Sequence, residues 1–511
     1  MLAQILSAAV MGIDAYIVKV EAHLEGGSPY FATVGLPDGA VRESRERVQS
    51  AVKNSGFDFP IKHIVINLAP ADVKKEGAAF DLPIAMGILA AAGNIRRDLL
   101  AEYIILGELS LDGSLRPIRG ALPIALAVVQ NGLRGIVLPK ENASEAAMAR
   151  DLEIIPVHTL QEAVQYFNSE LLIPPFRIDL QGVFAHRRDY SHDFEDVKGQ
   201  EHVKRALEVA AAGGHNIIMI GPPGSGKTML AKRLPSILPD LTLPEALETT
   251  KIHSVAGLLP PGEALITTRP FRSPHHTISD VGLIGGGNVP KPGEVSLAHH
   301  GVLFLDELPE FRKNVIEVMR QPLEEGQVTI SRALASLTYP AEFMLATAMN
   351  PCPCGFYGDQ DHSCGCSGQQ IRQYLSRISG PLMDRIDIHI EVPAVKYRDL
   401  TARPSGEPSA SVRQRVAGAR KIQIERFHNF PHLFCNARMD SRELHKYCTI
   451  DEAGERLLKS AINKLGLSAR AYDRILKVSR TIADLAGSEN IRPEHLSEAI
   501  QYRSLDRLHT G

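Results

Sequence analysis

The chain has 511 residues, of which 44% are hydrophobic and 23% charged, and its formal net charge is −3. At roughly 150 residues per domain, this length predicts two to four domains with enough apolar material for buried cores. The near-neutral charge excludes a chain-wide polycation, so any contact with nucleic acid must be local. No signal-peptide pattern opens the chain, and the apolar run 82–93 is shorter than the ~18 residues that span a bilayer. We therefore expect a cytoplasmic protein without membrane contact.

The first 170 residues carry patterns of both strands and helices. Residues 18–24 alternate apolar and polar side chains, as a half-buried strand does. Asp38 is the expected N-cap of a helix that ends near residue 54, and a short apolar strand follows at 64–68. Asp112-Gly113 stands between two apolar runs, which is typical of a hairpin. These patterns, with apolar runs at 136–138 and 154–157, predict an α+β domain over residues 1–170.

The rest of the chain divides at two stretches of low periodicity. Residues 171–192 contain paired prolines and are expected to form a linker. Residues 193–395 again mix strands and helices, so the fold class is α/β. Residues 396–511 are expected to form a helical lid, with helical patterns at 412–426, 440–448, 451–465, 470–486 and 493–503.

A phosphate-binding motif lies in the second α/β region. It matches G-x-x-x-x-G-K-[ST] in full, with Gly221, Pro222, Pro223, Gly224, Ser225, Gly226, Lys227 and Thr228. An apolar strand pattern over 216–220 precedes it and a helical pattern follows, which is the order that phosphate binding requires. The motif predicts ATP as ligand, with Lys227 at the phosphates and the Thr228 hydroxyl on Mg²⁺.

A second apolar run, 302–305, ends in two carboxylates. We expect Asp306 to hold Mg²⁺ through water and Glu307 to orient and deprotonate the attacking water. A strand end with two solvated acids is the alternative, and the phosphate-binding motif upstream argues against it.

The two adjacent carboxylates resemble those of AAA+ ATPases. By this resemblance, Asn350 is the sensor-1 residue, Arg385 is the arginine finger that reaches a neighbouring subunit, and Arg470 is the sensor-2 arginine. Surface salt bridges are the alternative roles for both arginines, and Arg377 is a rival finger. A finger acting on a neighbour requires an oligomer, so the analogy implies a homo-oligomeric ring, most simply a hexamer.

Two insertions distinguish this region from a minimal ATPase. Gly285-Gly286-Gly287 and Lys291 lie in a long segment before the second strand, and Arg332 lies in an alternating, hairpin-like segment over 327–338. The pair resembles the helix-2 insert and pre-sensor-1 hairpin of magnesium chelatase motor subunits and minichromosome maintenance helicases, in which hairpins point into the ring's pore. Arg332 and Lys291 are therefore candidate DNA contacts. A mobile glycine loop and an ordinary exposed arginine are the alternatives.

Six cysteines in so long a chain exclude a disulfide scaffold. Four of them form two C-x-C pairs that are nine residues apart, namely Cys352, Cys354, Cys364 and Cys366. Four thiolates in a short polar loop favour a structural, tetrahedral Zn²⁺ site. A disulfide or redox use and unligated thiols are the alternatives.

Residues 1 to about 505 resemble the ComM/YifB family of magnesium chelatase-like AAA+ proteins. The resemblance rests on GGHNIIMIGPPGSGKT, RPFRSPHHTISD, GVLFLDELPEF and ATAMNPCPCG. It implies a bacterial hexameric DNA helicase that acts on single-stranded or branched duplex DNA. Such a helicase promotes branch migration in homologous recombination and supports natural transformation, with recombination proteins as further partners. An ATPase motor for metal insertion, like the magnesium chelatase subunit, is the alternative function; an ATP-dependent protease and a non-catalytic scaffold fit less well.

The first domain resembles the proteolytic domain of Lon protease over 107–118 and 137–142. That enzyme needs a serine nucleophile and a lysine base. Ala78 or Ala79 stands where the serine would fall, and Leu122 or Pro123 stands where the lysine would fall. Peptidase activity is therefore expected to be absent. The neighbouring Lys74 and Lys75 are expected either to contact phosphates or to lie in a solvated turn.

Overall fold

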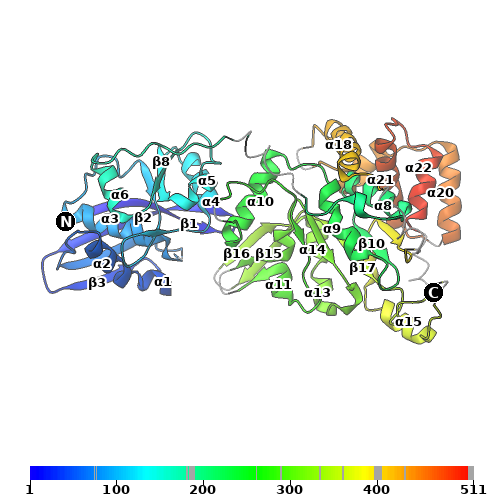
Figure 1. Ribbon diagram of the computed structural model, residues 1–511, viewed down its shortest axis with the longest axis horizontal. Helices are drawn as coiled ribbons and strands as arrows, with labels where there is room; N and C mark the ends of the chain where they lie inside the picture. The colour runs from blue at the N-terminus through cyan, green and yellow to red at the C-terminus, as the bar shows by residue number, and fades with distance from the viewer. Residues whose placement is uncertain are drawn as a thin grey trace. The chain divides into compact units, whose positions relative to one another are not determined.

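The structure is a computed structural model that forms two compact units. Unit 1 comprises Met1–Arg187 and Leu243–Thr267, and unit 2 comprises Arg188–Thr242 and Thr268–Gly511. Figure 1 colours the chain from its N-terminus in blue to its C-terminus in red. The residues that the structure describes are 1–73, 75, 77–179, 182, 190–260, 262–287, 290–332, 335–359, 362–395, 406–430, 433–465 and 467–503. Much of the expected linker, and the start of the expected lid at 396–405, lie outside the described residues.

A mixed sheet forms the centre of unit 1. Its strand order is β3-β4-β2-β1-β5-β8-β9 among the described residues. β1 and β4 both run antiparallel to β2, and the other neighbours are parallel. The strands are β1 Leu2–Met11, β2 Asp14–Glu25, β3 Tyr30–Val34, β4 His63–Ala69, β5 Tyr103–Ile105, β8 Gly135–Pro139 and β9 Glu153–Val157. The expected hairpin around Asp112-Gly113 is present as β6 Glu108–Leu109 and β7 Leu115–Arg116.

Helices of unit 1 bury one or more faces in its apolar core. The helix expected after Asp38 is present as two helices that meet at Glu43, whose N–H still donates to the Gly39 carbonyl at 3.0 Å. The Asp38 carboxylate still caps the first part, since Oδ1 accepts from the Val41 N–H at 2.8 Å. The helices are α1 Gly39–Arg42, α2 Ser44–Asn54, α3 Asp81–Ala92, α4 Ala121–Gln130, α5 Ala143–Ala146 and α6 Leu160–Phe167.

One helix of unit 1 comes from the middle of the chain. Helix α10, Leu243–Ala256, follows the phosphate-binding motif in sequence and yet packs against α4. The Ser254 hydroxyl accepts from the Gly120 N–H at 3.0 Å and donates to the buried carboxylate of Glu145. Burial raises the pKa of Glu145. Segment 243–267 therefore belongs to unit 1, although its neighbours in sequence belong to unit 2.

A parallel sheet forms the centre of unit 2. Its order is β11-β14-β17-β10-β18, with β11 Phe271–Arg272, β14 Val302–Leu305, β17 Met344–Met349, β10 Ile217–Ile220 and β18 Ile388–Glu391. Every residue of β10, β14 and β17 is buried, as expected for strands with both faces covered. Because neighbouring strands are parallel, their carboxyl ends meet at one edge of the sheet.

Helices and two small strand pairs surround this sheet. The strand pairs are β12 Gly285–Gly286 with β13 Lys291–Pro292, and β15 Gln327–Arg332 with β16 Ala335–Pro340. The helices before residue 395 are α8 Glu201–Gly213, α9 Lys227–Ile237, α11 Asp280–Ile284, α12 Glu294–Leu297, α13 Lys313–Glu317, α14 Arg320–Glu325, α15 Gly368–Leu375 and α16 Gly380–Met383.

The C-terminal part of unit 2 is helical, as the periodicity predicts. It consists of α18 Ser409–Arg426, α19 Ser441–Tyr447, α20 Glu452–Leu465, α21 Ala469–Leu485 and α22 Pro493–Gln501. Helices α18 and α21 both pack against α8 (Figure 1). Within the described residues, no helix has both the length and the apolar character that crossing a membrane requires.

A buried ion pair joins helix α21 to the central sheet of unit 2. Asp387, at the start of β18, is fully buried, and its carboxylate lies 2.6 Å from an Arg474 nitrogen and 3.1 Å from His215 Nδ1. Burial alone would raise the pKa of Asp387, but Arg474 and His215 outweigh it and hold that pKa well below its usual range. The ionised Asp387 therefore connects α8, α21 and β18.

Removing the Arg474 side chain should be costly, because it leaves a buried carboxylate without its main partner. We expect Arg474→Ala to lower the free energy of unfolding by about 3 kcal/mol, measured by urea denaturation. The matched control is Arg456→Ala, whose exposed pair with Glu452 spans 3.9 Å and should contribute below about 0.5 kcal/mol. Equal losses for the two variants would contradict this assignment.

Candidate nucleotide-binding site and metal centre

The phosphate-binding loop runs from the end of β10 into the first turn of α9. Gly224 has φ 76° and Gly226 has φ 90°, which are left-handed conformations that favour glycine. At Gly221, a Cβ atom would lie 2.0 Å from the Val392 carbonyl oxygen, so a larger residue cannot fit. The loop thus brings backbone N–H groups to the N-terminus of an 11-residue helix, where anions bind favourably.

Lys227 lies at the centre of this loop. Its ammonium donates to the Gly221 carbonyl at 2.7 Å and to the Pro222 carbonyl at 2.9 Å. The Asn350 side-chain oxygen, at the end of the neighbouring strand β17, lies 3.3 Å from the same nitrogen. Burial lowers the pKa of Lys227. The structure therefore brings the lysine and the predicted sensor-1 residue, which are far apart in sequence, into contact.

The predicted Mg²⁺ ligands also meet. The Thr228 hydroxyl donates to Asp306 Oδ2 at 2.6 Å, and the other oxygen of Asp306 accepts from the Glu307 N–H at 2.9 Å. A hydroxyl and a carboxylate at the edge of a phosphate-binding loop are the hard oxygen ligands that Mg²⁺ prefers. The residues present therefore fit a Mg²⁺ ion bound together with a nucleotide.

Glu307 has a partner that the sequence did not reveal. Its backbone is left-handed at φ 53°, and its carboxylate lies 3.4 Å from His276 Nδ1. His276 follows β11, which is the parallel neighbour of β14. The parallel order could have indicated this contact, because polar residues just after β11 must lie near those just after β14.

The two predicted arginines, Arg385 and Arg470, lie in one cluster beyond α16. Arg385 is buried, and its guanidinium pairs with Glu324 and donates to the Pro381 carbonyl. Arg470 is exposed and lies 3.1 Å from Asp384. Burial lowers the pKa of Arg385, and neighbouring cations that include Arg470 lower it further. The contact with Glu324 was not foreseen, because nothing in the local sequence connects residues so far apart.

The rival finger, Arg377, has a different environment. Its guanidinium is about half exposed and lies 3.1 Å from the Glu310 carboxylate. Arg377 thus forms an exposed salt bridge. This is the role that the sequence analysis gave as the alternative to an arginine finger for Arg385.

The two predicted DNA contacts converge on one glycine. Gly286 of β12 is paired with Lys291 of β13, and a Cβ atom at Gly286 would lie 3.1 Å from Nη2 of Arg332. The Tyr339 hydroxyl of β16 donates to the Pro290 carbonyl at 2.7 Å and holds the two strand pairs together. Both cations are exposed. The glycine run was expected as either an insert or a mobile loop, and its first two glycines form the paired strand β12. Residues 288, 289, 333 and 334 lie outside the described residues.

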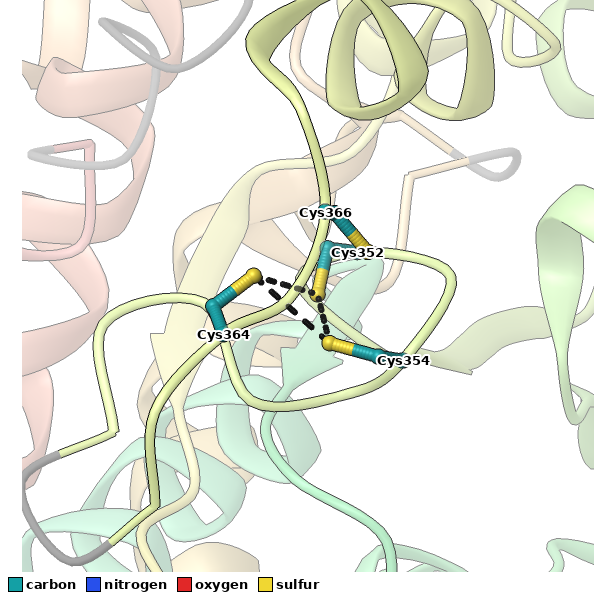
Figure 2. A group of neighbouring side chains, drawn as sticks. All are labelled: Cys352, Cys354, Cys364 and Cys366. Atoms are coloured by element: carbon teal, nitrogen blue, oxygen red, sulfur yellow. Dashed lines mark hydrogen bonds between the residues drawn. The ribbon is translucent and has the colours of Figure 1, made fainter.

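The four clustered cysteines converge in space as predicted (Figure 2). The Cys352 sulfur lies 3.3 Å from that of Cys354 and 3.7 Å from that of Cys364, and all four sulfurs lie within 4.8 Å of one another. Tetrahedral Zn²⁺ with ~2.3 Å bonds to sulfur requires sulfurs about 3.8 Å apart. A hydrogen bond from the Phe356 backbone and a second one from Cys352 lower the pKa of Cys354 to about 6, whereas the pKa values of Cys364 and Cys366 in the same cluster are raised. The set therefore fits Zn²⁺.

The cysteine loop packs against the phosphate-binding loop. At Gly355, which has φ 87°, a Cβ atom would lie 2.4 Å from Cδ of Pro223. Asn350 stands two residues before Cys352, so one continuous segment supplies both the sensor residue and the first cysteine. A metal bound to the cysteines would therefore stiffen a wall of the nucleotide site.

The positions expected to replace a protease dyad are partly buried on one side, at Ala78 and Ala79, and buried on the other, at Leu122 and Pro123. Ala78 and Ala79 belong to a short 3-10 helix, and Ala79 packs against the apolar cluster that includes residues of α4. Leu122 and Pro123 are buried in α4. Both expectations for Lys75 are wrong, because its side chain is fully buried and its ammonium donates to the Val73 carbonyl at 2.6 Å. Lys74 lies outside the described residues.

Comparisons with known families agree with this architecture. The magnesium chelatase subunit ChlI family matches residues 193–400, the family described as subunit ChlI of Mg-chelatase matches 20–142, and the ChlI C-terminal family matches 406–503. The fold and the site thus define a mixed α/β ATPase of the magnesium chelatase-like AAA+ class.

Relatives along the whole chain narrow this class. The chain is 46% identical over 512 residues to competence protein ComM of Haemophilus influenzae, covering 99% of this chain and 98% of that protein. It is 44% identical over 503 residues to YifB of Escherichia coli, covering 98% of this chain and 96% of that protein. The chain belongs to the ComM/YifB family. It is also 30% identical over 172 residues to Lon protease of Chloroflexus aurantiacus, covering 31% of this chain and 20% of that protein.

The cysteine geometry predicts bound zinc. Protein purified without chelators should contain about one Zn²⁺ per chain, measured by elemental analysis, because four thiolates complete the tetrahedral shell. Cys364→Ser should lose most of the metal, whereas Cys435→Ala, which removes a buried cysteine outside the cluster, should keep it. Protein without zinc, or equal zinc in both variants, would reject the site.

The position of Glu307 predicts a selective loss of turnover. Glu307→Gln should keep ATP affinity, because the phosphates are held by the loop and Lys227, while the hydrolysis rate falls on the order of 10²–10⁴-fold. Nucleotide binding and steady-state ATPase assays measure the two quantities. Glu310→Gln changes a nearby exposed carboxylate and should leave turnover near normal. Hydrolysis by Glu307→Gln near the normal rate would remove Glu307 from this role.

Proposed function

We propose that this chain is an ATP-hydrolysing, ring-shaped DNA motor that moves the branch points of recombination intermediates. The observation that carries the proposal is the convergence of Lys291 and Arg332 at Gly286. Both cations are exposed and come from separate insertions, and the Tyr339 hydrogen bond to the Pro290 carbonyl joins the two strand pairs that carry them. Lysine and arginine pairs of this kind bind phosphates without regard to sequence, as a translocating motor requires.

Hydrolysis would use groups that the parallel sheet brings together. The backbone N–H groups of the loop and the Lys227 ammonium bind the phosphates of ATP. Mg²⁺ held near Thr228 and Asp306 would neutralise charge on those phosphates. Glu307 accepts a proton from the attacking water, and the Asn350 amide orients that water. His276 holds the Glu307 carboxylate at its present position.

Subunit assembly would complete each site. Arg385 pairs with Glu324 of its own chain, so acting as a finger requires it to exchange this carboxylate for the γ-phosphate bound by a neighbour. Such an arginine contributes ~10³–10⁵ in rate. The closeness of Arg470 to Arg385 supports one shared interface for both residues. A closed ring of identical chains, a hexamer by analogy, satisfies this requirement at every site.

The relatives support the biological setting. The H. influenzae relative is named a competence protein, which supports a role in natural transformation, where incoming single strands pair with a resident duplex. Unit 1 would then serve DNA binding, assembly or contacts with recombination proteins. Proteolysis is not proposed, because alanines and buried apolar residues occupy the expected dyad positions.

A second candidate function is that of an ATPase motor for metal insertion. The matches to magnesium chelatase ChlI families along most of the chain favour it. The two functions share every hydrolytic residue and differ in what the hairpins contact. The response of the ATPase to DNA therefore distinguishes the DNA motor from the metal-insertion motor.

The test is the ATPase rate and strand exchange with linear, forked, three-way and four-way DNA. Branched DNA should stimulate hydrolysis several-fold, and branch points should move only while ATP is hydrolysed. Lys291→Ala with Arg332→Ala should keep the basal rate and lose stimulation, with a smaller salt dependence of DNA binding because two phosphate contacts are gone. Lys459→Ala, an exposed cation on α20, should behave as wild type. No stimulation by any DNA and no branch movement would reject this function and favour the metal-insertion motor.

A further inference from the structure

A groove of about 620 Å³ opens in unit 1, apart from the groups discussed so far. Its walls come from the edge strand β3, the helix α2 and the loop that connects α2 to β4. Figure 1 labels β3 and α2. Gly56, with φ 83° and open space beside it, turns the chain from the helix into that loop. The groove holds two kinds of side chain, aromatic rings and cations, which enter from different elements.

Aromatic rings form part of the wall. Tyr30 on β3 is 56% exposed, and Phe31, Phe57 and Phe59 are half-buried with surface still accessible. Phe31, Phe57 and Phe59 also pack against the apolar core of unit 1, and the Tyr30 ring lies edge-on to His63 with the ring centroids 4.8 Å apart. Their accessible surface is suited to stacking against planar groups.

Cations line the groove beside these rings, and the Arg45 guanidinium lies 5.9 Å from the centroid of the Phe31 ring. Arg45, Gln49 and Lys53 are spaced by four on α2, so they share one face of the helix, and Lys62 enters from the loop. Among the described residues that line the groove, Asp58 is the one carboxylate. The Arg45 contact with the neighbouring Glu46 spans 3.8 Å between exposed side chains and offsets little of this charge. The lining thus carries an excess of positive charge beside accessible aromatic surface.

This combination selects a class of ligand. Single-stranded nucleic acid offers unstacked bases to aromatic rings and phosphates to nearby cations. Duplex DNA hides its base faces, so it cannot use the rings. An acidic peptide would neutralise the cations and leave the rings without planar partners.

We propose that this groove binds a short segment of single-stranded DNA, with bases against Tyr30 and Phe59 and phosphates against Lys53 and Lys62. The proposal rests on the proposed DNA motor function and adds to it a place for one separated strand. It also gives unit 1 a task that needs neither a serine nor a lysine catalyst.

The test uses the full chain and fluorescein-labelled oligothymidylate, with binding followed by fluorescence anisotropy at several salt concentrations. Lys53→Ala with Lys62→Ala should lower the slope of log affinity against log salt by about 1.4, because each phosphate contact on a single strand contributes ~0.7. Tyr30→Ala should weaken binding roughly tenfold, and Tyr30→Phe should restore it because the stacking ring returns. Arg96→Ala with Lys140→Ala, exposed cations of unit 1 outside the groove, is the matched control.

The outcomes separate the groove from the motor function. Variants that bind oligothymidylate as tightly as the control, with an unchanged salt slope, overturn the groove proposal even if branched DNA still stimulates the ATPase. Wild-type chain that does not bind oligothymidylate also overturns it. A wild-type chain whose ATPase is not stimulated by any DNA would instead reject the motor function. Unchanged thermal unfolding midpoints, and recovery in Tyr30→Phe, show that weaker binding is not caused by unfolding.

Discussion

The parallel pairing of β10, β17 and β14 is the constraint on which the rest of the structure depends. Parallel strands end at the same edge of a sheet, so the phosphate-binding loop, Asn350 and the carboxylates of Asp306 and Glu307 must meet there. The strands can pair in this way because their side chains are buried on both faces and, apart from Thr347, are apolar. A polar substitution within any of them would disturb the sheet and the site together.

Two further contacts connect the sheet and its nucleotide site to other parts of unit 2. The ionised Asp387 fixes helix α21 and α8 to the strand beside β10, so the C-terminal helices follow the sheet. The cysteine loop touches the phosphate-binding loop where Gly355 meets Pro223. The first connection relies on a carboxylate that is expensive to bury without its partners, and the second on a glycine that lets the two loops approach closely. The nucleotide site is therefore supported on two sides by interactions outside the sheet.

Two inserted strand pairs and helix α10 distinguish this chain from a minimal ATPase. The strand pairs β12–β13 and β15–β16 lie close together at Gly285 and Gly286, where Cβ atoms would meet Ile330 and Arg332, and Gly286 is paired with Lys291. Helix α10 belongs to unit 1 through Ser254 and Glu145, although it begins just after the phosphate-binding helix in sequence. Segment 243–267 therefore interrupts unit 2 in sequence but packs within unit 1.

The sequence by itself determined the local elements and the family. Apolar runs bounded by glycine and charge predicted many of the strands, although not β1 or β3, and periodicity predicted the C-terminal helices to within a few residues, because these patterns reflect burial of one face or both. Features that depend on neighbours in space were missed or predicted wrongly from the sequence. Lys75 was expected at the surface and is buried, and one helix was expected where Glu43 divides two.

Only the tertiary structure decided which distant groups touch. The His276 contact with Glu307, the Glu324 contact with Arg385 and the approach of Arg332 to Gly286 join residues with no local pattern in common. The groove of unit 1 is likewise assembled from a strand, a helix and a loop. The physical reason is the same in each case. Local sequence sets backbone geometry and burial, whereas contacts between side chains depend on how separately formed elements pack.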